Sequence, residues 1–237
     1  MQTPQPKSTG GDFKPAPAGA HRAVCVRFID IGSQDVFNQK KGVTEKQHKV
    51  LLYWELSDEF MDDGRPFIVQ KRYTWSMHEK ANLRKDLESW RGKPYTTEEL
   101  AAGVNTRNML GQPATVTVMH AADQRDPSRI YANVVGVAPL AKGWRKPEPA
   151  SAFVYLALEP GEFRASAFDE LSDSLKVTIA KSPEYQAVSG YRPAPQSAPP
   201  ASRAAPLAQI VAPTPARERE PGEDDTLSDD LDDEIPF

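Results

Sequence analysis

Basic and aromatic side chains are interleaved along several stretches of this 237-residue chain. Ammonium and guanidinium groups can follow the phosphates of a single strand, while aromatic rings stack on its unpaired bases at about 1–3 kcal/mol per base. This mixture favours contact with single-stranded nucleic acid. The candidate contact residues are Lys49, Tyr53, Lys71, Arg72, Tyr73, Trp75, Arg91, Lys93, Arg129 and Tyr131.

The aromatic residues differ in how well they suit that role. Trp54 lies on the apolar side of an alternating segment and Trp90 ends an amphipathic one, so we expect both in the core. Tyr53 shares a strand face with Lys49 and is a better contact candidate. Tyr73 and Trp75 share a strand face with Lys71, but the apolar residues Phe67 and Val69 lie on that same face. For Tyr73 and Trp75, a core position and a contact position therefore both stay open.

The last nine residues, 229–237, read DDLDDEIPF and combine clustered carboxylates with an apolar tripeptide. Pro236 fixes its own φ and biases Ile235 toward an extended shape. Phe237 would fill an apolar pocket while its carboxylate meets an Arg or Lys, and the upstream acids would steer the encounter. We predict a protein-interaction tip made of Asp232, Asp233, Glu234, Ile235, Pro236 and Phe237.

The net charge of −4 hides an uneven distribution of charge along the chain. Residues 220–237 hold nine of the 33 acidic residues and none of the 29 basic ones, which leaves 29 basic and 24 acidic residues, or +5, in residues 1–219. A basic body that meets phosphates and an acidic tail that meets proteins would account for this pattern.

The elements that must position these side chains are mainly strands. Apolar residues alternate with polar ones in five segments, and residues 77–90 instead form an amphipathic helix with Ser76 and Glu79 as a capping box. A second short helix is expected from Thr97 to Gly103. Three strands, a helix and two strands is the order of an oligonucleotide-binding (OB) barrel, and an SH3-like barrel is its nearest rival. The five predicted strands are residues 21–31, 46–56, 66–77, 113–120 and 129–137.

Composition divides the chain further. Apolar residues from Phe168 to Ile179 recur at helical spacing, and this helix would pack on the barrel, in a homodimer or on another protein. The Pro- and Ala-rich stretch after it cannot bury enough apolar surface to fold. We therefore predict a flexible arm (1–19), an OB domain (20–147), a helical extension (148–185), a disordered linker (186–219) and an acidic tail (220–237).

Two parts of the chain resemble known proteins. The run from Leu52 through Leu110, with ATVTVMH (114–120) and IYANVVGVAPL (130–140), resembles phage-encoded single-stranded DNA-binding proteins. The tip resembles that of bacterial single-stranded DNA-binding proteins. The resemblance implies an OB barrel that coats single strands during replication, recombination and repair, and a tip that recruits proteins of those processes. The resemblance does not identify individual DNA-contact residues, and it does not imply a tetramer.

Several other classes are not expected. The chain lacks both an apolar run long enough for a membrane helix and the apolar core of a signal peptide. A single cysteine, Cys25, cannot form an internal disulfide and fits the cytoplasm, that of the host if the chain is phage-encoded. Four scattered histidines do not make a zinc motif, and no catalytic motif stands out. We expect a non-enzymatic binding protein without metal or cofactor; the alternatives are an OB adaptor that binds protein and a nuclease.

Overall fold

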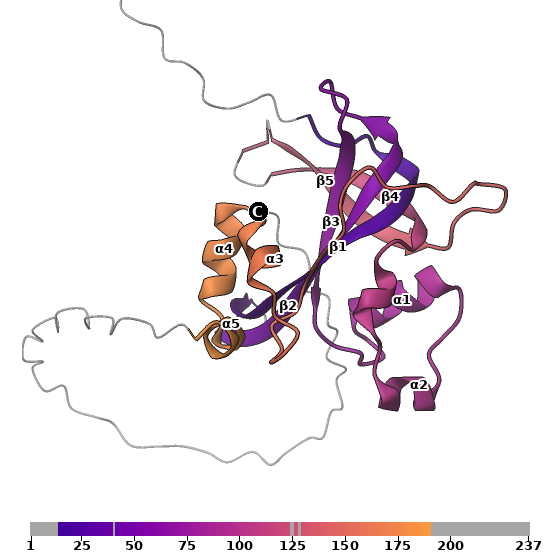
Figure 1. Cartoon of the computed structure of the whole chain (residues 1–237). Coiled ribbons are helices and arrows are strands. Elements are labelled where there is room, and N and C mark those ends of the chain that lie inside the picture. The colour runs from indigo at the N-terminus through magenta and orange to yellow at the C-terminus, as the bar shows by residue number, and fades with distance from the viewer. Residues whose placement is uncertain (1–13, 40, 124–125, 128, 191–237) are drawn as a thin grey trace, which may run out of the picture.

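The computed structural model describes residues 14–39, 41–123, 126–127 and 129–190, and this part of the chain is mainly β (Figure 1). Five strands follow the order β3-β2-β1-β4-β5, each antiparallel to its neighbour, and a short β6 runs parallel to β1. The five expected strands are confirmed, whereas β6 was not predicted. The strands are β1 (Gly19–Asn38), β2 (Val43–Phe60), β3 (Pro66–Thr74), β4 (Pro113–Ala122), β5 (Ile130–Ala138) and β6 (Val154–Leu156).

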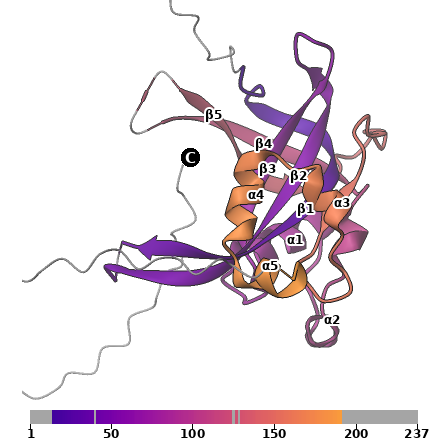
Figure 2. The ribbon, with the colours of Figure 1, turned by 60° about the vertical axis from the view of Figure 1, so that its left-hand side comes forward.

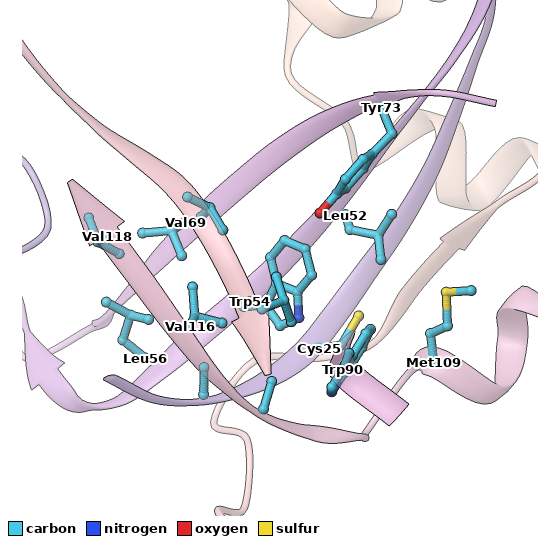
Figure 3. Close-up of a cluster of buried hydrophobic side chains, with 14 of the residues drawn as sticks. Cys25, Leu52, Trp54, Leu56, Val69, Tyr73, Trp90, Met109, Val116 and Val118 are labelled. Atoms are coloured by element: carbon cyan, nitrogen blue, oxygen red, sulfur yellow. The ribbon is translucent and has the colours of Figure 1, made fainter. Parts of the chain in front are cut away.

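The main core lies on one face of the sheet, because alternate residues of each strand point to the same side. On β2 these are Val50, Leu52, Trp54 and Leu56, all buried. Trp54 meets Trp90 edge-on, with ring centroids 5.9 Å apart, so both tryptophans belong to the core as expected (Figure 3).

Helix α1 (Asn82–Arg91) lies against β3 and β5, which contact each other although they stand at opposite ends of the strand order. The predicted start of this helix is wrong. Ser76 does not cap it, since its hydroxyl accepts a hydrogen bond from the His78 amide instead and Ala81 is still extended. Residues 75–81 connect the end of β3 to α1, and the helix begins only after this connection.

The short α2 (Thr97–Ala102) begins where the sequence predicts. Thr96 and Glu99 form a capping box in which the threonine hydroxyl accepts from the Glu99 amide and the glutamate accepts from the Thr96 amide. A single 3-10 turn, η1 (Thr106–Met109), then leads into β4.

The C-terminal extension packs on the other face of the sheet (Figure 2). Its three short helices are α3 (Ala165–Asp169), α4 (Asp173–Ala180) and α5 (Pro183–Val188). The single helix predicted from Phe168 to Ile179 is wrong, because Ser172 is extended and the neighbouring Leu171 is buried in a second apolar cluster. This cluster contains Ile29, Ile31, Leu51, Val154, Leu156, Leu158, Leu171 and Ile179.

Gly32 permits the closest approach between the sheet and this extension. Its φ is +66°, and a Cβ at this position would lie 2.4 Å from the Ser182 hydroxyl oxygen. Ser182, the N-cap of α5, is fully buried there and accepts from the Tyr185 amide. A side chain at residue 32 would therefore push α5 off the sheet.

Both predicted flexible regions begin or end elsewhere than expected. Ala16 is buried and its carbonyl oxygen lies 2.8 Å from His120 Nε2, so residues 14–19 are not a free arm. Helix α5 extends to Val188, into the predicted linker. The acidic tail and its tip lie outside the described residues. None of the described helices has the length and apolar character that a membrane crossing requires.

Candidate nucleic-acid interface

A row of polar and aromatic side chains crosses β1, β2 and β3 on the face opposite the main core, beside the C-terminal extension that packs on the same face. Arg27 pairs with Tyr53, and Tyr53 pairs with Gln70 in the strand register. In the neighbouring row, Ile29 of β1 pairs with Leu51 of β2, and Leu51 pairs with Arg72 of β3. Because paired residues of adjacent strands project to the same side, the row places Arg27, Tyr53 and Gln70 side by side.

A β-bulge puts Arg27 in this row. The register shifts between Cys25 and Arg27, so the side chain of Arg27 faces away from the core while the next residue, Phe28, is buried in it. The Arg27 guanidinium carbon lies 5.9 Å from the centre of the Tyr53 ring. A cation and a flat ring are thus held together on rigid strands.

The electrostatics of this row suit an anionic ligand. Burial raises the pKa of Tyr53 to about 12, although the charges of Arg27 and Arg72 act to lower it. A tyrosine hydroxyl is neutral near pH 7 even at its ordinary pKa of about 10, and the raised pKa of Tyr53 reflects how much of its ring is removed from solvent. Within the described residues, Arg27 is half-buried and has no carboxylate within ion-pair distance, and its buried Nε has no hydrogen-bond partner.

Trp75 comes directly after β3 and is 37% exposed. Its ring meets Phe28 edge-on at 5.9 Å and lies 6.4 Å from the His48 ring, while its backbone amide donates to the His48 carbonyl. These contacts hold the indole in place and leave part of it open to solvent, as a stacking surface requires.

Two of the sequence-predicted contact residues are wrong, because the structure buries them. Tyr73 is 1% exposed, and its hydroxyl donates to Asp86 from inside the core (Figure 3). Lys49 is 4% exposed and donates to the Thr74 hydroxyl. The face that Tyr73 shares with Phe67 is the core face, whereas Lys49 lies on the opposite face and is covered there. Neither side chain is open to a base or a phosphate in the folded protein.

Three further predicted cations are already paired with carboxylates. Lys71 lies 2.8 Å from Asp86, Arg91 lies 2.7 Å from Glu99, and Arg129 lies 3.4 Å from Asp126. The pairing with Arg91, its largest cause, lowers the pKa of Glu99 to about 2, so that pair keeps both charges near neutral pH. A phosphate would have to compete with the carboxylate at each of these sites.

The remaining predicted residues are dispersed. Tyr131 donates to Asp123 at the base of the β4–β5 hairpin, and Lys93 is exposed after α1. Sequence reasoning missed Arg27, although the alternation that places Phe28 in the core puts its neighbour on the opposite face. Of the ten predicted contacts, only Tyr53 and Arg72 lie in the rows beside it.

Among the described residues, no group of three or more His, Cys, Asp or Glu side chains is placed to hold a metal ion. No protein-family model matches the chain, and a search of curated proteins finds no similar sequence.

Proposed function

We propose that this chain is a non-enzymatic single-stranded DNA-binding protein that coats and protects single strands during phage or host DNA replication, recombination and repair. The observation that carries the proposal is the cluster of Arg27, Tyr53 and Arg72 on the outer face of the sheet, the face opposite the main core, where Tyr53 is partly buried against the C-terminal extension. It provides charge for phosphates and a ring for bases on one rigid surface.

The proposed fold is an OB-type barrel. The order of elements supports it, and so does the place of α1, which lies against both β3 and β5 where these strands meet. In OB folds the face of strands 2 and 3 binds oligonucleotides, and this is where Tyr53 and Arg72 lie.

Binding is tested by titrating the full chain with oligo-dT and following tryptophan emission at several salt concentrations. We expect binding whose affinity falls steeply with salt, because each neutralised phosphate of a single strand adds about −0.7 to the slope of log K against log salt. No response at low salt would reject DNA binding and favour a protein-binding adaptor. Incubating labelled strands with Mg²⁺ separates binding from cleavage, since a binder leaves them intact.

The outer-face cluster is tested by Arg27→Gln, which removes one charge from a guanidinium without a carboxylate partner among the described residues. We expect weaker binding and a salt slope that is shallower by about 0.7. Lys85→Gln is the matched control, because it removes one charge from an exposed position on α1. An equal effect of both variants would mean that only the overall charge matters.

The second part of the proposal is that the acidic tip recruits replication, repair or recombination proteins to the coated strand. Its support is the DDEIPF ending, which lies outside the described residues. In-cell crosslinking of the full chain and of a chain lacking Ile235–Phe237 tests it. Loss of crosslinks to such proteins, with DNA binding kept, is the expected result, and unchanged crosslinks would reject the role of the tip.

A further inference from the structure

The connection between β5 and β6 carries a second group of basic and aromatic side chains. Lys142, Trp144, Arg145 and Lys146 are all exposed, and Trp144 is 41% exposed. In Figure 1 this connection loops out on the right, on the side of the molecule away from α4.

The basic residues of this loop differ from the paired cations described above in their lack of a carboxylate partner among the described residues. Within the part of the chain that the structure describes, Lys142, Arg145 and Lys146 make no ion pair. Three positive charges next to an open indole therefore have no internal carboxylate to satisfy them. An anionic ligand could bind here without displacing one.

Hydrogen bonds hold the loop at both ends. The Ala141 amide donates to the Thr115 hydroxyl oxygen at 3.0 Å, and Arg22 donates to the Arg145 carbonyl at 3.3 Å. Beyond the loop, the buried Glu55 carboxylate accepts from the amides of residues 150 and 151, at 2.7 and 2.8 Å. A loop that is anchored in this way loses less conformational entropy when it binds a ligand.

An open hollow of about 580 Å³ lies beside the loop, lined in part by Arg145, Lys146 and Glu148. The exposed ring of Phe153 also lines it and packs closely on Gly111, where a Cβ would lie 3.2 Å from the ring. The hollow thus offers a second aromatic surface next to two cations.

We propose that this loop is a second contact site for single-stranded DNA, in which Trp144 stacks on a base while Lys142, Arg145 and Lys146 bind phosphates. The inference rests on the proposed function and extends it, because it places a stretch of the bound strand outside the face of β1–β3. A single base–aromatic stack is worth enough to make Trp144 a measurable contributor to affinity.

Photocrosslinking tests the site directly. Full-length protein is irradiated with oligo-dT that carries 5-iodouracil, and the crosslinked peptides are identified by mass spectrometry. We expect a crosslink at Trp144 that is kept in Trp144→Phe and lost in Trp144→Ala. Crosslinks confined to residues of the β1–β3 face would overturn the second site while leaving DNA binding intact.

Affinity measurements with a short and a long oligo-dT provide the quantitative test. Trp144→Ala should weaken binding of the long strand by roughly five-fold or more, and the combined change K142Q/R145Q/K146Q should make its salt slope shallower by up to about 2. Phe60→Ala removes another exposed ring, from the end of β2, and serves as the matched control.

The outcomes separate the two proposals. If wild-type protein binds neither strand, the proposed function fails. If wild type binds but Trp144→Ala and the combined variant match it in affinity and salt slope, only the second site fails. Since all four substituted side chains are exposed, circular dichroism should show an unchanged fold.

Discussion

At the scale of single residues, exposure separates two aromatic side chains that the strand pattern places on one face. Tyr73 is buried in the core with its hydroxyl on Asp86, whereas Trp75 follows the end of β3 and keeps part of its ring in solvent. Alternation assigns both to the same side of the strand. Only the end of the strand at Thr74 releases the second ring from the core.

These positions predict opposite phenotypes. Trp75→Ala should keep the fold and weaken oligo-dT binding by about 1–3 kcal/mol. Tyr73→Ala should instead destabilise the protein by about 3–5 kcal/mol, as truncation of large buried aromatic residues does. Urea denaturation and fluorescence titration measure the two effects. Normal folding of Tyr73→Ala would contradict its place in the core.

His48 provides a pH-dependent contact on β2. Its Nε2 lies 2.7 Å from Asp30, and its Nδ1 lies 3.8 Å from Glu184 of α5. The hydrogen bond with Asp30 raises the pKa of His48 above 6.5 more than burial lowers it, and the charges of Asp30, Glu184 and Glu159 also raise it. The protonated ring is therefore favoured in the folded protein.

A raised pKa means that this stabilisation is complete below pH 6.5 and is lost as the pH rises through the folded-state pKa. We expect the difference in unfolding free energy between wild type and His48→Gln to shrink over that range. Urea denaturation of both proteins at a series of pH values measures it. A difference that does not change with pH would show that His48 titrates alike in the folded and unfolded states.

At the scale of elements, the C-terminal extension depends on packing rather than on helix propensity. Its helices have five, eight and six residues, too short to be stable alone. The cluster formed with β1, β2 and β6 holds them on the sheet. Ile179 of α4 is fully buried in this cluster, whereas Val177 on the same helix is 57% exposed.

This difference predicts a matched pair of variants. Ile179→Ala should destabilise the protein by about 2–5 kcal/mol, whereas Val177→Ala should change stability by no more than about 0.5 kcal/mol. Chemical denaturation compares them, with intact DNA binding of Val177→Ala as the control. Equal stability of the two variants would mean that α4 does not dock on the sheet in solution.

At the scale of the whole molecule, opposite charges lie on two parts of one chain, and the proposed function gives each part its own ligand. Residues 1–219 carry +5, and the nine acids of residues 220–237 are attached to the same chain. A tethered acidic segment is held at high effective concentration near the basic body. It should therefore compete with phosphates wherever their affinity depends on charge.

Removal of residues 220–237 should accordingly tighten oligo-dT binding at low salt, and the gain should shrink as salt rises and screens the competition. Fluorescence titration of the full and shortened chains over a salt series measures the effect. A chain lacking only Ile235–Phe237 keeps all nine acids and is the control. Equal affinity of the full and shortened chains at low salt would exclude the competition.

Local patterns were enough to predict the strands and the core tryptophans. The period of two in β2 identifies Leu52, Trp54 and Leu56 as buried, because a strand that buries one face must alternate. The run from Thr97 to Gly103 was likewise sufficient to locate α2, and the structure adds the capping box of Thr96 and Glu99 at its start. By contrast, Ser76 and Glu79 have the same spacing but cap no helix, since the chain first turns away from β3.

The sequence by itself determined the mainly β architecture, the opposite charges of body and tail and the kind of side chain that could meet DNA. Only the tertiary structure decided which of those side chains are available. It buried Lys49 and Tyr73 and paired Lys71 with Asp86. It left Arg27 without a carboxylate partner among the described residues, and it left Trp144 open to solvent. The physical reason is that burial and ion pairing depend on neighbours that are distant in the chain, which no local spacing specifies.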